Sequence, residues 1–313
     1  MPEQRALLVG IDQYPYPPNN LNSCVNDSLA IQRMLMQTYG FDPAKIAILH
    51  NQDATLANVR SALDTLFADA KPGDRLVYFQ SSHGYRYPKG DTLIEVLCLY
   101  DQFLEDHELV DRTRNLPPEV LTVVLDACHS GGMDKLFFPP GEMPAMARAK
   151  VFQASSEQVA QKAGLFQQIN KVKFFGRKPT LDTGAIIKNW TPTPPPGAPP
   201  AKDLSEGEAE LNGALFAACM ADQTAAAGSP PTRNLSAFTF ALLDQLDTRI
   251  SLADLCGRVV ARLQALNMRQ TPVIDVPIAA QAMAAKTFIT DTPVNGVSSV
   301  DVAIRKILDQ LAG

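Results

Sequence analysis

The chain has 313 residues, of which 46% are hydrophobic and 19% are charged, and its formal net charge at pH 7 is -5. A chain of this length and composition can bury a large hydrophobic core, which excludes a protein that is disordered as a whole. The two signs of charge are interspersed, which excludes the basic stripe that nucleic acid or an anionic membrane requires. Without an apolar run of transmembrane length or a recognisable signal peptide, the sequence predicts a cytoplasmic protein with no nucleic acid or membrane partner.

Short apolar runs alternate with amphipathic segments along the first half of the chain, and this alternation predicts strands and helices in turn. Strands are predicted at residues 6–12, 45–50, 75–80, 92–100 and 120–127, and helices near 26–39 and 56–68. Continuous apolar strands between helices are typical of a parallel sheet that is covered on both faces, so the predicted fold class is α/β.

The pattern weakens between residues 137 and 211, where the run TPTPPPGAPPAKDLSEGEAE is Pro-rich and polar. We predict a partly disordered loop or linker there. Order resumes with a sixth strand at 214–221, helices at 237–246 and 251–267, and an amphipathic segment at 300–313. These limits divide the chain into parts at 1–136, 137–211, 212–290 and 291–313.

The cysteines show neither CxxC pairs nor ordered Cys/His spacing, which predicts reduced thiols without a disulfide framework or a zinc site. They are Cys24, Cys98, Cys128, Cys219 and Cys256. Most free cysteines are small buried hydrophobic residues, so a catalytic cysteine must be singled out by its surroundings. Cys128 is singled out because it follows a buried-type strand and begins the Gly-rich turn CHSGG.

Loops that follow the carboxyl ends of parallel strands lie at one edge of the sheet and commonly carry function. Three such loops are GIDQYPYPPNNLNSCVND, SSHGYRYPKGD and ACHSGGMD, and we expect them to converge. A cysteine peptidase needs a thiolate, a neighbouring imidazole and backbone donors for the oxyanion. We predict Cys128 as the nucleophile, His83 as the base, and the amides of Gly84 and Cys128 as oxyanion donors. His129 is an alternative base, although neighbours on a turn rarely face each other.

Four segments carry a resemblance to metacaspases, and they occur in the order of that family. VVLDACHSGG resembles the motif D-[SA]-C-H-S-G, VYFQSSHG resembles Y-[FY]-S-G-H-G, LNSCVND is similar to L-x-G-C-x-N-D, and FAACMADQTAA resembles the opening of the small subunit. His83 also lies 45 residues before Cys128, close to the spacing of the caspase signature. The chain therefore resembles caspase-like cysteine peptidases of family C14, of the bacterial metacaspase type without a prodomain, from residue 5 to about 290.

The resemblance implies a caspase-hemoglobinase fold, with six mostly parallel strands and helices on both faces, and proteolysis by His83 and Cys128. It names residues 1–136 the large-subunit-like half, 137–211 a linker or insertion, and 212–290 the small-subunit-like half, with a helical tail at 291–313. Ser82 stands where the family has Gly, and we expect it to tighten the turn before the histidine.

The resemblance also implies an acidic pocket for the residue before the scissile bond. Caspases that cut after Asp carry a neutral Gln two residues before the cysteine, whereas this chain has Asp126 there. The metacaspase pocket positions map onto Asp27 and Ser81, so the predicted preference is for Arg or Lys. The alternatives are that Asp126 caps the following turn and that Asp27 is a first-turn helix acid. Cys24 is interpreted as a packing residue.

No cofactor is required for this chemistry, but calcium is a candidate activator, as in many metacaspases. Asp101, Glu105, Asp106 and Asp134 supply oxygen ligands of the kind that calcium prefers. The alternative interpretation of these acids is a solvated acidic helix start.

The linker contains Arg177 and Lys178 in FFGRKP, where an enzyme that prefers basic residues is able to cut itself. The alternative is an intact lid or partner-binding insertion. Because the first strand begins within ten residues of Met1, we expect no recruitment prodomain, and control by a ligand, processing or an activating or regulatory protein. The predicted enzyme is a monomer that acts on proteins or peptides. The competing hypothesis is a catalytically silent scaffold on the same fold.

Overall fold

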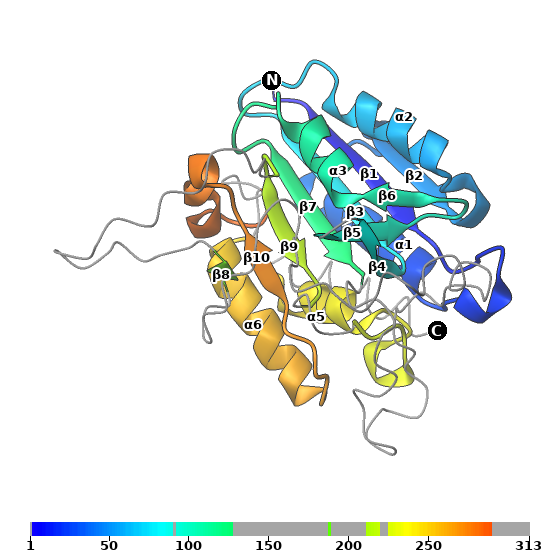
Figure 1. The fold of residues 1–313 in the computed structure, drawn as a ribbon. Coiled ribbons are helices and arrows are strands. Elements are labelled where there is room, and N and C mark those ends of the chain that lie inside the picture. Colours follow the sequence, from blue (N-terminus) through cyan, green and yellow to red (C-terminus); the bar gives the residue numbers. More distant parts are fainter. Residues whose placement is uncertain (1, 90–91, 128–186, 189–210, 220–224, 290–313) are drawn as a thin grey trace.

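A seven-stranded sheet lies at the centre of the protein, as the computed structural model shows for residues 2–89, 92–127, 187–188, 211–219 and 225–289 (Figure 1). Its strand order is β2-β1-β3-β7-β9-β10-β8. The strands are β1 (Gln4–Gly10), β2 (Ile46–His50), β3 (Arg75–Ser81), β7 (Leu121–Asp126), β9 (Ala214–Ala217), β10 (Val273–Asp275) and the two-residue β8 (Ile187–Lys188). The predicted fold, six mostly parallel strands, is confirmed, with β8 as a short additional edge strand.

The strand directions bring the predicted loops to one edge. β1 is parallel to β2 and β3, β3 is parallel to β7, and β7 is parallel to β9. β10 runs antiparallel to β9 and parallel to β8. In the register of β3 and β7, Ser81 lies beside Asp126, so both strands end at the same level.

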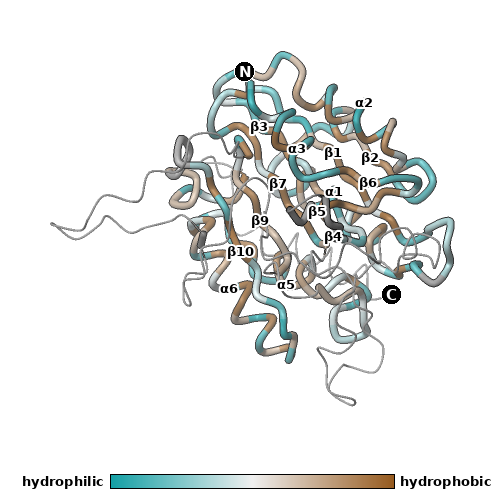
Figure 2. The backbone as a smooth tube through the Cα atoms, viewed as in Figure 1, coloured by the Kyte–Doolittle hydropathy of each residue, from teal (hydrophilic) through white to brown (hydrophobic). Residues whose placement is uncertain are grey.

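Helices cover both faces of this sheet, as the sequence predicts. α1 (Cys24–Tyr39), α5 (Ala237–Gln245) and α6 (Leu252–Ala265) pack on one face, while α2 (Leu56–Phe67) and α3 (Asp106–Thr113) pack on the other. Alternate strand residues serve the two cores: Leu8 and Phe79 belong to the first, and Leu7 and Tyr78 to the second. Figure 2 accordingly shows hydrophobic strands in the interior and hydrophilic positions along the outer sides of the helices.

One predicted strand lies outside the main sheet. The run at 92–100 forms β5 (Thr92–Cys98), which pairs antiparallel with β4 (Gly84–Lys89) and β6 (Phe103–Glu105) in a separate three-stranded sheet. Its place in the main sheet is taken by β10, which the sequence did not reveal. A three-residue strand that begins after a proline gives too short an apolar run to be recognised from periodicity.

The predicted helices in the described residues are confirmed, and their ends carry recognisable caps. Thr55 accepts a hydrogen bond from the Asn58 amide at the start of α2, and Gly40 adopts the left-handed conformation (φ 70°) that ends α1. The helices that the structure describes include none long and apolar enough to cross a membrane. The linker predicted at 137–211 lies outside the described ranges, apart from β8 and residue 211. The amphipathic segment predicted at 300–313 also lies outside them.

Asp12, in the loop after β1, caps α1 from outside the helix. Its carboxylate accepts hydrogen bonds from the backbone N–H groups of Ser23 (2.9 Å), Cys24 (2.8 Å) and Val25 (3.1 Å). A carboxylate at a helix N-terminus satisfies amides that have no partner within the helix and complements the helix dipole. The loop is therefore anchored to the helix that carries Asp27.

We expect Asp12→Ala to lower the free energy of unfolding by about 1–3 kcal/mol, because three amides lose a charged acceptor. Urea denaturation followed by circular dichroism measures this change. Asp42→Ala is the matched control, since Asp42 caps a single exposed turn through the Ala44 amide. Equal losses in the two variants would contradict the role given to Asp12.

Candidate active site

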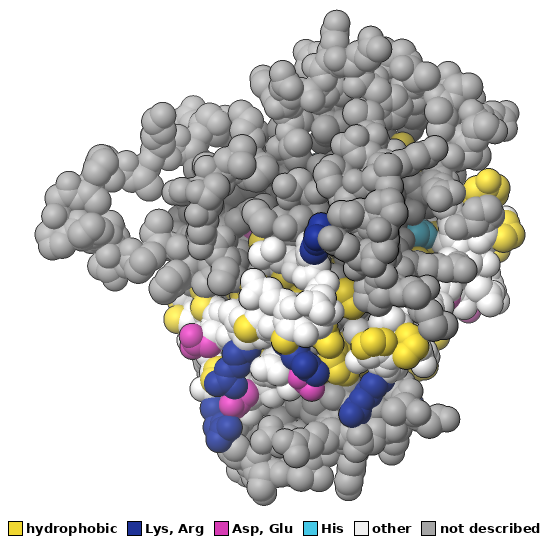
Figure 3. Space-filling view, turned by 90° about the horizontal axis from the view of Figure 1, so that it is seen from below, with side chains coloured by type: hydrophobic (Ala, Val, Ile, Leu, Met, Phe, Trp, Pro, Cys, Tyr) yellow, Lys and Arg dark blue, Asp and Glu magenta, His cyan; other side chains and the backbone are white. Residues whose placement is uncertain are grey.

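The residues predicted for catalysis and for the acidic pocket lie, where they are described, at the edge where β1, β3 and β7 end. The Ile11 amide donates to the Ser81 carbonyl oxygen at 3.1 Å, and the Ser82 amide donates to the Asp126 carbonyl oxygen at 3.3 Å. Cys128 lies outside the described residues and directly follows Ala127, which is buried. Figure 3 views the molecule from below, the side toward which these strands end.

His83 is almost completely buried, with 2% of its surface exposed, and the loop after β1 fixes its ring. The ring Nε2 lies 2.6 Å from the backbone carbonyl oxygen of Asn19. A carbonyl oxygen accepts and never donates, so Nε2 carries the hydrogen in this contact. In the neutral imidazole, Nδ1 is then the nitrogen that accepts a proton, and the ring is oriented for use as a base.

Tyr14 holds the backbone of the same histidine. Its hydroxyl oxygen accepts a hydrogen bond from the His83 amide at 3.1 Å, and the hydroxyl donates to the Cys98 carbonyl oxygen at 3.3 Å. The Tyr14 and His83 ring centroids are 5.1 Å apart. Burial raises the pKa of Tyr14 well above its usual value, so the hydroxyl remains a donor throughout the neutral pH range.

We expect Tyr14→Phe to lower kcat by about 3- to 30-fold, because the His83 amide loses its acceptor and the ring loses a fixed support. Steady-state kinetics on a fluorogenic reporter peptide measures this effect. The control is Tyr39→Phe, which also removes a buried tyrosine hydroxyl. Tyr39 lies near the start of β1, at the opposite end of the sheet, and packs against Phe288. If both variants kept the wild-type kcat, Tyr14 would have no role in positioning His83.

Asp27 is fully buried in the first turn of α1 and accepts hydrogen bonds from two other elements. Ser81, at the end of β3, donates its hydroxyl to Asp27 Oδ2 at 2.6 Å. Ser236, the residue before α5, donates its backbone N–H to Oδ1 at 2.8 Å and its hydroxyl to Oδ2. The carboxylate thus joins α1, β3 and α5, which differs from the alternative of a simple first-turn helix acid.

Asp126, at the end of β7, is also fully buried and bonds to the same helix α5. Its Oδ2 accepts the Thr239 hydroxyl at 2.7 Å and the Thr239 backbone N–H at 3.2 Å. The alternative for Asp126 was a cap of its own following turn, whereas these contacts reach 113 residues along the chain. The structure therefore gathers Asp27, Ser81 and Asp126 around the first turn of α5.

Gly84 and Ser82 lie on either side of His83 in the chain. Gly84 follows His83, is buried and begins β4, where it pairs in register with Leu97. Ser82, which replaces a family glycine, is not among the residues with positive φ. Its hydroxyl donates to the His83 carbonyl oxygen at 3.0 Å, so this turn accommodates a side chain. The oxyanion role of Gly84 and Cys128 stays a prediction.

The acids predicted as calcium ligands serve local structure where they are described. Asp101 accepts the Leu56 amide at 2.8 Å at the start of α2, and Glu105 lies 3.3 Å from His107. Burial raises the pKa of Asp106. Within the described ranges no three His, Cys, Asp or Glu side chains form a group that could hold a metal ion. Asp134 lies outside those ranges, so the calcium prediction remains a prediction.

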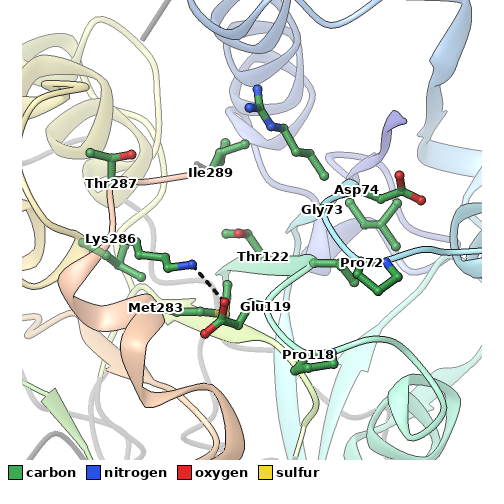
Figure 4. A pocket seen from close by; sticks show the side chains of 14 residues that line it. Pro72, Gly73, Asp74, Pro118, Glu119, Thr122, Met283, Lys286, Thr287 and Ile289 are labelled. Carbon is green, nitrogen blue, oxygen red and sulfur yellow. Dashed lines mark hydrogen bonds and ion pairs between the residues drawn. The ribbon is translucent and has the colours of Figure 1, made fainter. Parts of the chain in front are cut away.

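A pocket of about 390 Å³ lies at the opposite edge of the sheet, where β3 and β7 begin (Figure 4). An ion pair of 2.9 Å between Lys286 and Glu119 crosses it, and Thr122 and Met283 are among its other lining residues. Its lining includes neither the predicted catalytic residues nor the residues predicted to bind a basic substrate side chain. The candidate active site is therefore defined by the side chains around His83 and not by this cavity.

Comparison with known proteins identifies the family to which this fold belongs. A family model described as "Caspase domain", peptidase C14, matches residues 3–285. The chain therefore belongs to the caspase-domain family of peptidases. A solved structure of a Geobacter sulfurreducens protein has the same fold, with a TM-score of 0.58 at 19% identity, over 92% of this chain and 99% of that one.

The curated relatives are metacaspases, and the predicted resemblance to that family is confirmed. Metacaspase-8 of Arabidopsis thaliana is 35% identical over 144 residues, which cover 42% of this chain and 38% of that protein. Metacaspase-1B of Aspergillus fumigatus is 33% identical over 145 residues, which cover 41% of this chain and 35% of that protein. The matched segment thus spans well under half the length of either relative.

Proposed function

We propose that this protein is a cysteine endopeptidase that cleaves proteins and peptides after Arg or Lys, with Cys128 as nucleophile and His83 as general base. The observation that carries the proposal is the orientation of the His83 ring. Nε2 donates to the Asn19 carbonyl oxygen, so Nδ1 is the nitrogen that takes the thiol proton. The contact with Asn19 persists in the imidazolium and stabilises its positive charge.

The position of the nucleophile in the chain supports this pairing. Cys128 follows Ala127 at the end of β7, and β7 is the sheet neighbour of β3, which ends two residues before His83. Proton transfer from Cys128 to His83 gives the thiolate that attacks the substrate carbonyl carbon. The developing oxyanion binds the predicted amides, and His83 then protonates the leaving amine. Water, deprotonated by His83, hydrolyses the acyl-enzyme and restores the thiol.

The preference for a basic residue rests on the two buried carboxylates. Asp27 and Asp126 both accept hydrogen bonds from the first turn of α5. Ser81 contacts the first and pairs in register with the second. A cationic side chain that reaches them leaves water and pairs with negative charge at low local dielectric. The planar guanidinium of Arg can bind carboxylate oxygens bidentately, whereas Lys binds as a point charge.

The function is tested by turnover of fluorogenic peptides that end in Arg, Lys or Asp, with and without calcium, beside Cys128→Ala. Cleavage after Arg or Lys that is absent from the variant is the expected result. Cleavage after Asp alone would contradict the roles of Asp27 and Asp126. No turnover in any condition would favour the silent scaffold.

The same samples test the two remaining predictions of activation. Mass spectrometry of the wild type and Cys128→Ala detects self-cleavage, for which Arg177 and Lys178 are the proposed sites. Fragments that appear in both proteins would exclude self-processing. Rates that are equal with calcium and with a chelator would exclude calcium as an activator.

A further inference from the structure

The first turn of α5 faces two carboxylates that belong to other elements. α5 has no acidic residue in its own first turn, although a helix N-terminus favours negative charge. Asp27 from α1 and Asp126 from β7 supply that charge, each through hydrogen bonds from one residue of the turn. Ser236 serves Asp27, and Thr239 serves Asp126, each with a backbone N–H and a hydroxyl.

The hydroxyl donors around Asp27 have a defined direction. The Ser236 hydroxyl donates to Asp27, so in its 2.8 Å contact with Ser23 it can only accept. Ser23 therefore donates to Ser236, and the Ser23 oxygen in turn accepts the Gly228 amide at 2.9 Å. This chain of donors ends at Asp27, which is the arrangement that an ionised carboxylate requires.

We propose that Ser236 and Thr239 are positioning residues that set the specificity of the peptidase by holding Asp27 and Asp126 in a fixed orientation. This inference rests on the proposed function, because it takes these carboxylates as the groups that bind a basic side chain. A guanidinium needs carboxylate oxygens in a fixed plane, and supporting hydrogen bonds keep such a carboxylate from rotating. The chemistry of Cys128 and His83 does not depend on either residue.

We expect Ser236→Ala to raise KM for an Arg peptide about tenfold while kcat stays within about threefold of the wild type. Thr239→Val, which keeps the shape and the backbone N–H, is expected to act in the same direction. The conservative variants Ser236→Thr and Thr239→Ser retain the hydroxyls and should restore KM. Steady-state kinetics with Arg and Lys peptides measures all four variants.

Two controls separate positioning from a general structural effect. Ser251→Ala removes the N-cap of α6, whose hydroxyl oxygen accepts the Asp254 amide at 3.0 Å, and should leave KM unchanged. Alkylation of Cys128 by iodoacetamide does not use the pocket, so its rate should match the wild type in every variant. A lower alkylation rate in Ser236→Ala would show damage to the dyad and overturn the inference.

The kinetic results distinguish a failure of this inference from a failure of the proposed function. A wild type that cuts after Arg or Lys, together with Ser236→Ala and Thr239→Val of unchanged KM, overturns the inference alone. A wild type that cuts after neither residue overturns the proposed function and the inference with it.

Discussion

Replacing His83 by Ala is expected to lower kcat/KM on an Arg peptide by about 10³-fold or more, because the thiol loses its base and the leaving amine loses its acid. The contact of Nε2 with the Asn19 carbonyl oxygen orients this ring. KM should change little, since the ring does not bind the side chain of P1, the substrate residue before the scissile bond.

Two further measurements make this result specific. Cys128 should be alkylated by iodoacetamide more slowly in His83→Ala than in the wild type, because less thiolate forms. The four other cysteines are buried, and burial raises the pKa of Cys256 to about 12, so they should contribute little to the signal. His107→Ala removes an exposed histidine and is the control. His129→Ala tests the alternative base: a comparable loss there would contradict the assignment of His83.

Asp27→Asn is expected to lower kcat/KM on Arg and Lys peptides by about 10²-fold, mainly through KM, because the proposed pocket loses one of its two charges. The amide also presents hydrogens where Ser81 and Ser236 now donate, so part of the network must rearrange. Asp126→Asn should have an effect of the same kind.

The comparison that decides this prediction is between charged and neutral P1 residues. With the pocket charge reduced, the ratio of turnover after Arg to turnover after Gln should fall in both variants. Asp42→Asn, which changes an exposed cap, is the control for an altered net charge. An unchanged ratio in both variants would show that the basic preference, if present, comes from other residues.

The sequence predicted the fold because long apolar strands and amphipathic helices carry periodic signals. It failed at β10, which is three residues long, and at β5, whose apolar run gives no sign of which sheet it joins. Strand partners depend on contacts between distant residues, and periodicity reports only burial.

Sequence motifs predicted the site residues, but they did not predict the residues that hold those side chains in place. Asn19 holds His83 through its backbone carbonyl, so its side chain type carries no signal. Ser236 and Thr239 act more than 100 residues away from the acids that they hold. Serine and threonine at a helix start are ordinary caps, and only the tertiary structure shows that these two donate to carboxylates of other elements.

The division of the α5 contacts between the two halves of the chain has a consequence for assembly. Asp27 and Asp126 come from residues before the linker, and Ser236 and Thr239 come from residues after it, while β7 and β9 pair directly across the same boundary. A large half without its counterpart would contain two carboxylates that lack the donors of α5, and burying them in that state is unfavourable. Two separately synthesised polypeptides should therefore form the proposed acidic pocket only on association, so that peptidase activity would report the joining of the fragments.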